Sequence, residues 1–150
     1  MDFITGLFDM NFAALVPEMN ALLGFVRVIL SLLMLAGPLS MLILGVMYLF
    51  FAPPEANYKF GFRTFNGMGS VEAWQFTQKI GGIAYAGLGL ILLIVMLVIT
   101  IGFGAKDIYL VTAIAIKALL WQAGLALLAR LVVGILAAVF FTANGDRRRQ

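Results

Sequence analysis

The sequence predicts an all-α membrane protein with three transmembrane helices, an N-terminal interfacial helix and a structured cytoplasmic loop between helices 1 and 2. Hydrophobic residues make up 63% of the chain and charged residues 11%, whereas soluble domains average about 45–50% apolar and about 25% charged residues. Residues 28–52 and 80–105 carry no charge, and each run exceeds the roughly 20 residues that a helix needs to cross a bilayer. We therefore expect a single integral membrane domain, 1–150.

The composition also argues against several function classes. The chain has no Cys and no His, which excludes disulfides, thiolate or imidazole metal sites and His-based acid–base catalysis. Glu55, Glu72 and Asp107 show no spacing typical of a carboxylate dyad or a metal site. No basic run interleaved with aromatic residues is long enough to indicate nucleic acid binding. We expect a protein that is not an enzyme, with no catalytic residues, no metal, no cofactor and no nucleic acid partner.

The N-terminal segment, residues 2–15, has the pattern of a short amphipathic helix. Asp2, Thr5 and Asp9 fall at helical spacing on one face, and most of the other positions are apolar. Such a helix lies in the membrane interface rather than crossing the bilayer; a loosely ordered terminus is the alternative. Acidic residues precede the first basic one, so we expect no cleavable secretory signal.

The three spans are predicted at about 20–52, 71–105 and 108–143. Pro17 suits the first turn of a helix, Gly37-Pro38 predicts a kink within the first span, and Pro53-Pro54 ends it. The turn at Lys106-Asp107 is so short that spans two and three must form an antiparallel hairpin. Small residues four positions apart let membrane helices approach closely. Two such pairs are the predicted helix-packing residues, although glycine is common in membrane helices generally: Gly82 with Ala86, and Gly134 with Ala138.

Two basic residues, Lys117 and Arg130, lie inside the third span. If the bilayer is centred between them, each side chain can extend along the helix to its nearest interface. A channel or transporter would use such residues to line a path, but three spans enclose little volume. An unpaired guanidinium at membrane depth is costly. We therefore predict that Glu55 or Glu72 neutralises Arg130 or Arg63.

The distribution of basic residues predicts the orientation. The N-terminal side and the turn between spans two and three hold only Arg27 and Lys106, so the opposite side carries the excess that is typical of the cytoplasm. That side holds Lys59, Arg63, Lys79, Arg147, Arg148 and Arg149. The N-terminus is thus predicted outside, with loop 53–79 and the C-terminus inside. The Arg147–Arg149 run also suits anionic lipid headgroups of the bilayer.

Loop 53–79 is the most distinctive part of the sequence. Tyr58, Phe60 and Phe62 alternate with Lys59, Gly61 and Arg63. In an extended segment this pattern places the aromatic side chains on one face and the cations on the other. Ser70 is a natural N-cap for the second span, with Glu72 in its first turn. The loop is either a binding surface or an anchored connector that binds no ligand.

The same residues resemble the signature loop of the SdpI family, small bacterial membrane proteins named for immunity to a sporulation-delaying toxic peptide. The resemblance lies in Asn57-x-x-Phe60-Gly61-Phe62-Arg63-Thr64, then Ser70-x-Glu72-Ala73-Trp74-x-x-Thr77, followed by Gly81. It implies a bacterial inner-membrane protein that protects its producer from a membrane-active peptide, and some members are thought to hold a regulator at the membrane. The partner- or peptide-binding candidates are Asn57, Tyr58, Phe60, Gly61, Phe62, Arg63, Thr64, Glu72 and Trp74.

Two functions follow as expectations. The first is a non-enzymatic immunity or signalling protein whose loop binds a toxic peptide or a cytoplasmic regulator. The second is an accessory structural subunit of a larger membrane complex, with glycine-lined helix faces packing on neighbouring subunits. The long apolar third span and the interfacial N-terminus fit the second function as well as the first.

Overall fold

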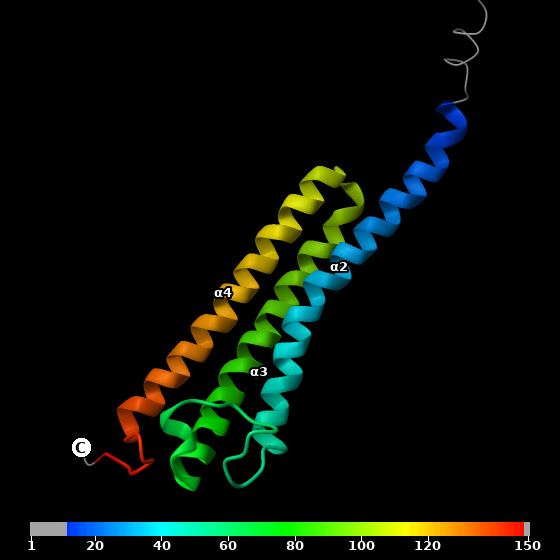
Figure 1. Ribbon diagram of the computed structural model, residues 1–150. Coiled ribbons are helices and arrows are strands. Elements are labelled where there is room, and N and C mark those ends of the chain that lie inside the picture. Colours follow the sequence, from blue (N-terminus) through cyan, green and yellow to red (C-terminus); the bar gives the residue numbers. More distant parts are fainter. Residues whose placement is uncertain (1–11, 149–150) are drawn as a thin grey trace, which may run out of the picture.

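The computed structural model describes residues 12–148, and the side chains from residue 19 onward. Three long helices dominate it: α2 (Phe12–Phe50), α3 (Val71–Ile101) and α4 (Ile108–Phe140). Two short 3-10 turns, η1 (Asn66–Met68) and η2 (Gly102–Ala105), lie in the connections. Figure 1 shows a bundle in which the α2–α3 loop and the C-terminal end of α4 lie together, opposite the turn between α3 and α4.

The three-span prediction is confirmed at the level of helices. Residues Met19–Phe50, Val71–Ala105 and Ile108–Phe140 are each long and apolar enough to cross a membrane, as expected for a multi-pass membrane protein. The first and third helices end slightly earlier than predicted, at Phe50 and Phe140. Most of the predicted interfacial helix, residues 2–11, lies outside the described residues. Residues 12–15 form the start of α2 without a break, so the interfacial segment stays a prediction.

Small residues let α2 and α3 cross closely. A Cβ added at Gly82 would approach the side chain of Leu49 on α2 to 2.6 Å, and one added at Gly89 would lie 2.5 Å from the backbone nitrogen of Leu42. Gly45 on α2 faces the backbone of Ala86 without room for a side chain. The helix backbones are therefore in direct contact, as small residues permit in lipid.

The α2 helix continues through Gly37-Pro38 because α4 replaces the hydrogen bond that proline removes. Pro38 has no N–H to donate to the carbonyl of Met34, four residues earlier. The side chain of Gln122, buried on α4, donates to that carbonyl at 2.9 Å. Gly37 leaves space for the amide, since a Cβ there would overlap the Gln122 side chain. Figure 1 shows α2 bending along its length.

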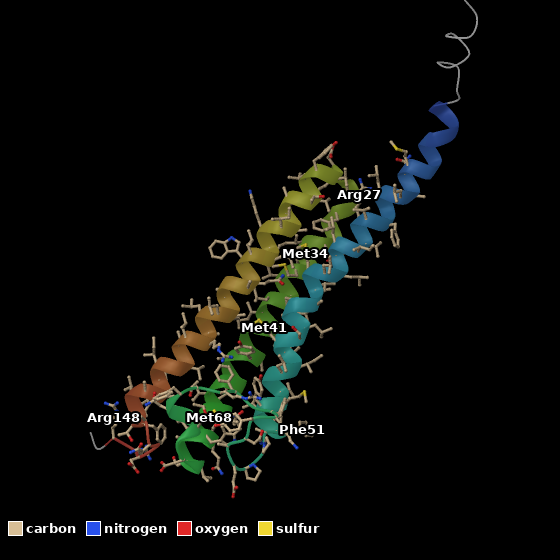
Figure 2. All side chains as sticks on the ribbon, in the orientation of Figure 1. Arg27, Met34, Met41, Phe51, Met68 and Arg148 are labelled. Carbon is tan, nitrogen blue, oxygen red and sulfur yellow. The ribbon has the colours of Figure 1, made fainter. Side chains whose placement is uncertain are left out.

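The end of the bundle opposite the loop is closed by a few polar contacts. Arg27 of α2 donates from Nη2 to the carbonyl of Lys106 at 3.0 Å, and Figure 2 shows Arg27 beside the α3–α4 turn. The side chain of Asp107 accepts from the Tyr109 N–H at 2.9 Å and so caps α4. The predicted short turn and antiparallel hairpin are thus confirmed.

Candidate functional site

The predicted loop folds into a compact structure that we call the cap: residues 51–78, which include the first turns of α3, and residues 141–148 after α4. Figure 2 shows the cap, around the label Met68, packed across the end of the bundle. Apart from η1, the backbone of residues 51–70 has no helix to satisfy its polar groups. Side chains of the cap satisfy several of them.

Gln78 holds the centre of the loop against α3. Its side-chain oxygen accepts from the N–H of Phe62 at 2.7 Å, and its amide nitrogen donates to the Phe62 carbonyl at 2.9 Å. Both residues are buried. Because one glutamine amide satisfies both polar groups of a buried residue, the loop backbone can lie directly on an apolar helix. The sequence offers one signal for Gln78, a glutamine one turn after Trp74 at the start of an apolar span.

Trp74 and Gly61 form a second anchor. Trp74 is fully buried, and its indole N–H donates to the carbonyl of Pro53 at 2.7 Å. Gly61 has a φ of 133°, a conformation that L side chains rarely adopt, and a Cβ there would overlap the indole ring. Gly81 plays a related part below Phe62, since a Cβ would approach that ring to 2.6 Å. These residues therefore set the path of the loop.

Asn57 and Thr64 make the local turns. The side-chain oxygen of Asn57 accepts from the N–H groups of Lys59 and Phe60, both at 2.9 Å. The hydroxyl of Thr64 accepts from the N–H of Gly67 at 3.0 Å. Short polar side chains that bond to nearby backbone groups in this way favour turns over helix or strand. Both predicted site residues are thus occupied with the backbone of the loop itself.

The predicted separation of aromatic and cationic faces is wrong. Phe62 is 2% exposed and packs edge-on against Tyr48 and Tyr85, with ring centroids 5.6 and 5.3 Å apart. Phe60 lies 5.5 Å from the Tyr48 ring, whereas Tyr58 is 83% exposed. The alternation fails because the chain is not extended: it turns at Asn57 and changes direction at Gly61.

The two arginines use backbone carbonyls rather than carboxylates. Arg63 donates from Nη2 to the carbonyl of Tyr58 at 2.5 Å, and Arg130 of α4 donates to the carbonyl of Arg63 at 3.5 Å. The Arg130 guanidinium also lies 6.0 Å from the centre of the Phe62 ring. Arg130 thus extends from α4 toward the cap, in the direction that a snorkelling side chain takes.

The predicted neutralisation of Arg63 or Arg130 by Glu55 or Glu72 is therefore wrong. Among the described side chains, those of residues 19–148, the one ion pair joins Glu72 to Arg147, at 3.3 Å. Glu72 is occupied because the chain after α4 folds back toward the start of α3. The loop carbonyls accept the guanidinium N–H groups in place of an acid.

The segment after α4 completes the cap. Phe141 and Arg147 form an isolated antiparallel bridge, and Phe141 is 2% exposed. Asn66 donates to the carbonyl of Phe141 at 3.1 Å, and the Ser70 hydroxyl donates to the carbonyl of Gly145 at 2.7 Å. Ser70 also accepts from the N–H of Ala73 at 3.1 Å, which confirms its prediction as an N-cap. Arg147 and Arg148, which belong to the run predicted to suit lipid headgroups, thus also contact Glu72 and the Phe141 carbonyl.

The two predicted helix-packing pairs lie in different surroundings. Gly82 and Ala86 face α2 at the close crossing. Around Gly134, in contrast, a Cβ would meet no atom within 4 Å. Gly134 and Ala138 line an open groove of about 450 Å³ between α4 and loop residues 63–66. The second pair therefore lines this groove, and Gly134 makes no close helix contact within the described residues.

The cap gathers all nine predicted binding residues, but most of them serve the cap itself. Phe62 and Trp74 are buried, and Asn57, Gly61 and Thr64 shape the loop. The chain matches no family model, no curated protein and no solved structure. The functional interpretation therefore depends on the geometry of the cap and on the faces that it leaves exposed.

Proposed function

We propose that this chain is a non-enzymatic, SdpI-like membrane protein that gives immunity to, or signals the presence of, a membrane-active toxic peptide through its cap. The observation that carries the proposal is that the residues of the resemblance converge in one rigid cap. Asn57, Phe62 and Trp74 form hydrogen bonds to other cap residues, and Gly61 packs directly against the Trp74 ring. A fixed surface binds with a smaller loss of conformational freedom than a mobile one does.

The cap presents two aromatic side chains that its own packing does not use. Tyr58 is 83% exposed and Phe65 is 82% exposed. Aromatic residues and arginine dominate the central contacts of protein interfaces, and Arg63 contacts the carbonyl of Tyr58. We propose Tyr58 and Phe65 as the contacts for a peptide or a regulator, with Arg63 fixing the backbone beside them.

The proposal includes the location of the cap. The excess of Lys and Arg at the cap end supports a cytoplasmic cap in a bacterial inner membrane, with the N-terminus outside. Cysteine labelling tests this directly, because the chain has no native Cys. A cysteine at Tyr58 is expected to resist a membrane-impermeant reagent in intact cells, and one at Tyr109 to react.

Substitution of Tyr58 tests the function. The chain is expressed in bacteria that are sensitive to the sporulation-delaying toxic peptide, and survival is measured against peptide concentration. Tyr58→Ala and Phe65→Ala are expected to lower, several-fold, the peptide concentration that the cells survive. The reason is that each substitution removes an exposed ring at the cap. Tyr109→Ala is the matched control, since Tyr109 is 84% exposed at the opposite end of the bundle.

Equal membrane levels of all variants are required for this comparison and are checked by immunoblot. Full protection by the doubly substituted Tyr58→Ala, Phe65→Ala chain would contradict a role of the cap in immunity. The same conclusion follows if the unsubstituted chain gives no protection. Loss of protection in Tyr109→Ala to the same extent would mean that the effect is not specific to the cap.

A second function, an accessory subunit of a larger membrane complex, is favoured by one feature of α2. The part of α2 before Arg27 extends past the α3–α4 turn (Figure 1). Within it, Met19, Leu22 and Phe25 are each about 60% exposed. Extraction in a mild detergent distinguishes the two functions, because a stoichiometric large partner supports the subunit and an isolated small protein supports the peptide-binding function.

A further inference from the structure

A groove beside Gly134, about 450 Å³ in volume, lies between α4 and the cap. Loop residues 63–66 form one wall, and Leu127, Leu131, Gly134 and Ile135 of α4 form the other. These leucines and the isoleucine are each more than half exposed. Since Gly134 has no side chain and no neighbour, the wall is hollowed at its centre. The α4 wall of the groove is thus mainly apolar and open to the surroundings.

Two guanidinium groups line the same groove. Arg63 and Arg130 both contribute to it, and their hydrogen bonds go to backbone carbonyls. Among the side chains of residues 19–148 neither arginine forms an ion pair with an acidic group. No described carboxylate therefore pairs with either guanidinium, and a guanidinium offers five N–H donors, more than these carbonyls use.

The groove lies where the membrane surface is expected. Arg130 contacts the Phe62 ring, and that ring packs on Gly81 of α3. Lys79 is the last charged residue before the charge-free run 80–105. The two guanidinium groups are thus level with the boundary between charged and apolar sequence. In a bilayer this level corresponds to the interface, where the phosphates of lipids lie.

We propose that this groove is a binding site for one anionic phospholipid. Arg63 and Arg130 bind the phosphate and the headgroup, because guanidinium matches the geometry of phosphate oxygens. One acyl chain lies along Leu127 toward the bilayer, and the hollow at Gly134 admits the glycerol region. The charges of site and ligand are complementary, whereas the cationic headgroup of a zwitterionic lipid would be repelled by the two arginines.

Native mass spectrometry of the full chain in mild detergent tests the site. Phosphatidylglycerol and phosphatidylcholine with the same acyl chains are added, and the bound fractions are compared. The unsubstituted chain is expected to prefer phosphatidylglycerol. Arg130→Gln is expected to weaken that preference about fivefold, as one arginine near the surface contributes about that factor. Gly134→Leu keeps both charges but fills the hollow, and is expected to reduce the preference by a similar factor.

Matched controls lie on the same helix. A Cβ at Gly124 would also meet nothing within 4 Å, so Gly124→Leu adds the same side chain away from the groove. Lys117→Gln removes another exposed cation of α4. Both controls are expected to retain the lipid preference, and circular dichroism checks that every variant is helical.

Several results would overturn the site. One is equal binding of both lipids by the unsubstituted chain. Another is a full preference for phosphatidylglycerol in Gly134→Leu, or the same loss in Gly124→Leu. Glycerol phosphate, which lacks acyl chains, is the third arm: if it displaces phosphatidylglycerol at equal concentration, the groove binds free phosphate and not a lipid. A protein that co-purifies with the chain and is released by Gly134→Leu, with lipid binding unchanged, would assign the groove to a protein partner.

Discussion

Two buried glutamines satisfy backbone groups in two different regions of this bundle. Gln122 lies at the middle of the helices and accounts for one carbonyl, the Met34 carbonyl that Pro38 leaves without a donor. Gln78 lies at the cap end and accounts for both the N–H and the carbonyl of Phe62. Gln122 replaces one hydrogen bond within a continuous helix. Gln78 allows a segment without secondary structure to lie against an apolar surface.

The difference shows how a membrane protein can leave regular structure. Each backbone polar group that lacks a partner in a nonpolar environment costs free energy, so irregular backbone persists there only where other groups satisfy it. At mid-bundle one side-chain donor is enough. In the cap, the hydrogen bonds of Gln78 are not the only ones. The side chains of Asn57, Ser70 and Trp74 also bond to backbone groups of the cap. We therefore expect the cap to depend more strongly on its polar side chains than the helix midsection does.

The largest effect is expected for Gln78→Leu. This substitution leaves both polar groups of Phe62 buried without partners, at a cost of about 3 kcal/mol for the two. Unfolding by sodium dodecyl sulfate, followed by circular dichroism, measures the change. Gln75→Leu is the control, since Gln75 is exposed on the same helix and its contact to Pro54 is long, at 3.5 Å. Equal stability of the two variants would show that the hydrogen bonds of Gln78 do not stabilise the cap.

A smaller effect is expected for Gln122→Leu, about 1 kcal/mol, which is within the range of hydrogen bonds between membrane helices. The cost should shrink in a Pro38→Ala background, because the new N–H at position 38 can bond to the Met34 carbonyl. The same unfolding assay on both single variants and the double variant measures this coupling. Strictly additive effects would show that Gln122 does not act through that carbonyl.

The smallest effect is expected for Arg147→Ala. Its ion pair with Glu72 is 3.3 Å long, but the two side chains are 70% and 61% exposed. Exposed pairs of this kind contribute little, so we expect a loss of about 0.5 kcal/mol or less. Ser70→Ala removes both a helix cap and the bond to Gly145, and should cost more. If Arg147→Ala is the more harmful variant in the unfolding assay, charge rather than hydrogen bonding holds the cap together.

The helices follow from the sequence because membrane spans depend on composition and length alone. Residues 28–52 and 80–105 carry no charge, and Ser70 and Pro53 provide the local start and stop signals. The pair Gly82 and Ala86 lies at the crossing of α2 and α3, as its spacing indicated. These features are encoded by residues close together in the chain.

The contacts of the cap could not be predicted because they join distant parts of the chain. The partners Ser70 and Gly145 are 75 residues apart, and so are Arg147 and Glu72. Three consecutive arginines indicate a solvated tail when the fold that brings Glu72 near them is not known. One signal in the sequence pointed to Gln122: it is a single amide in the third span of a chain that carries Pro38. Its pairing with the Met34 carbonyl could not be predicted, because that requires the relative positions of α2 and α4.

The bonds from Asn66 and Ser70 to the segment after α4 also constrain how the protein is made. Ribosomes synthesise residues 51–70 well before residues 141–148. While α3 and α4 are being inserted, the loop therefore lacks its hydrogen bonds to the segment after α4. The contact forms only when α4 has crossed the bilayer and emerges on the same side as the loop. Closure of the cap therefore reports correct insertion of the third span, and a chain with an inverted or unthreaded α4 would expose Asn66 and Ser70 to quality-control proteases.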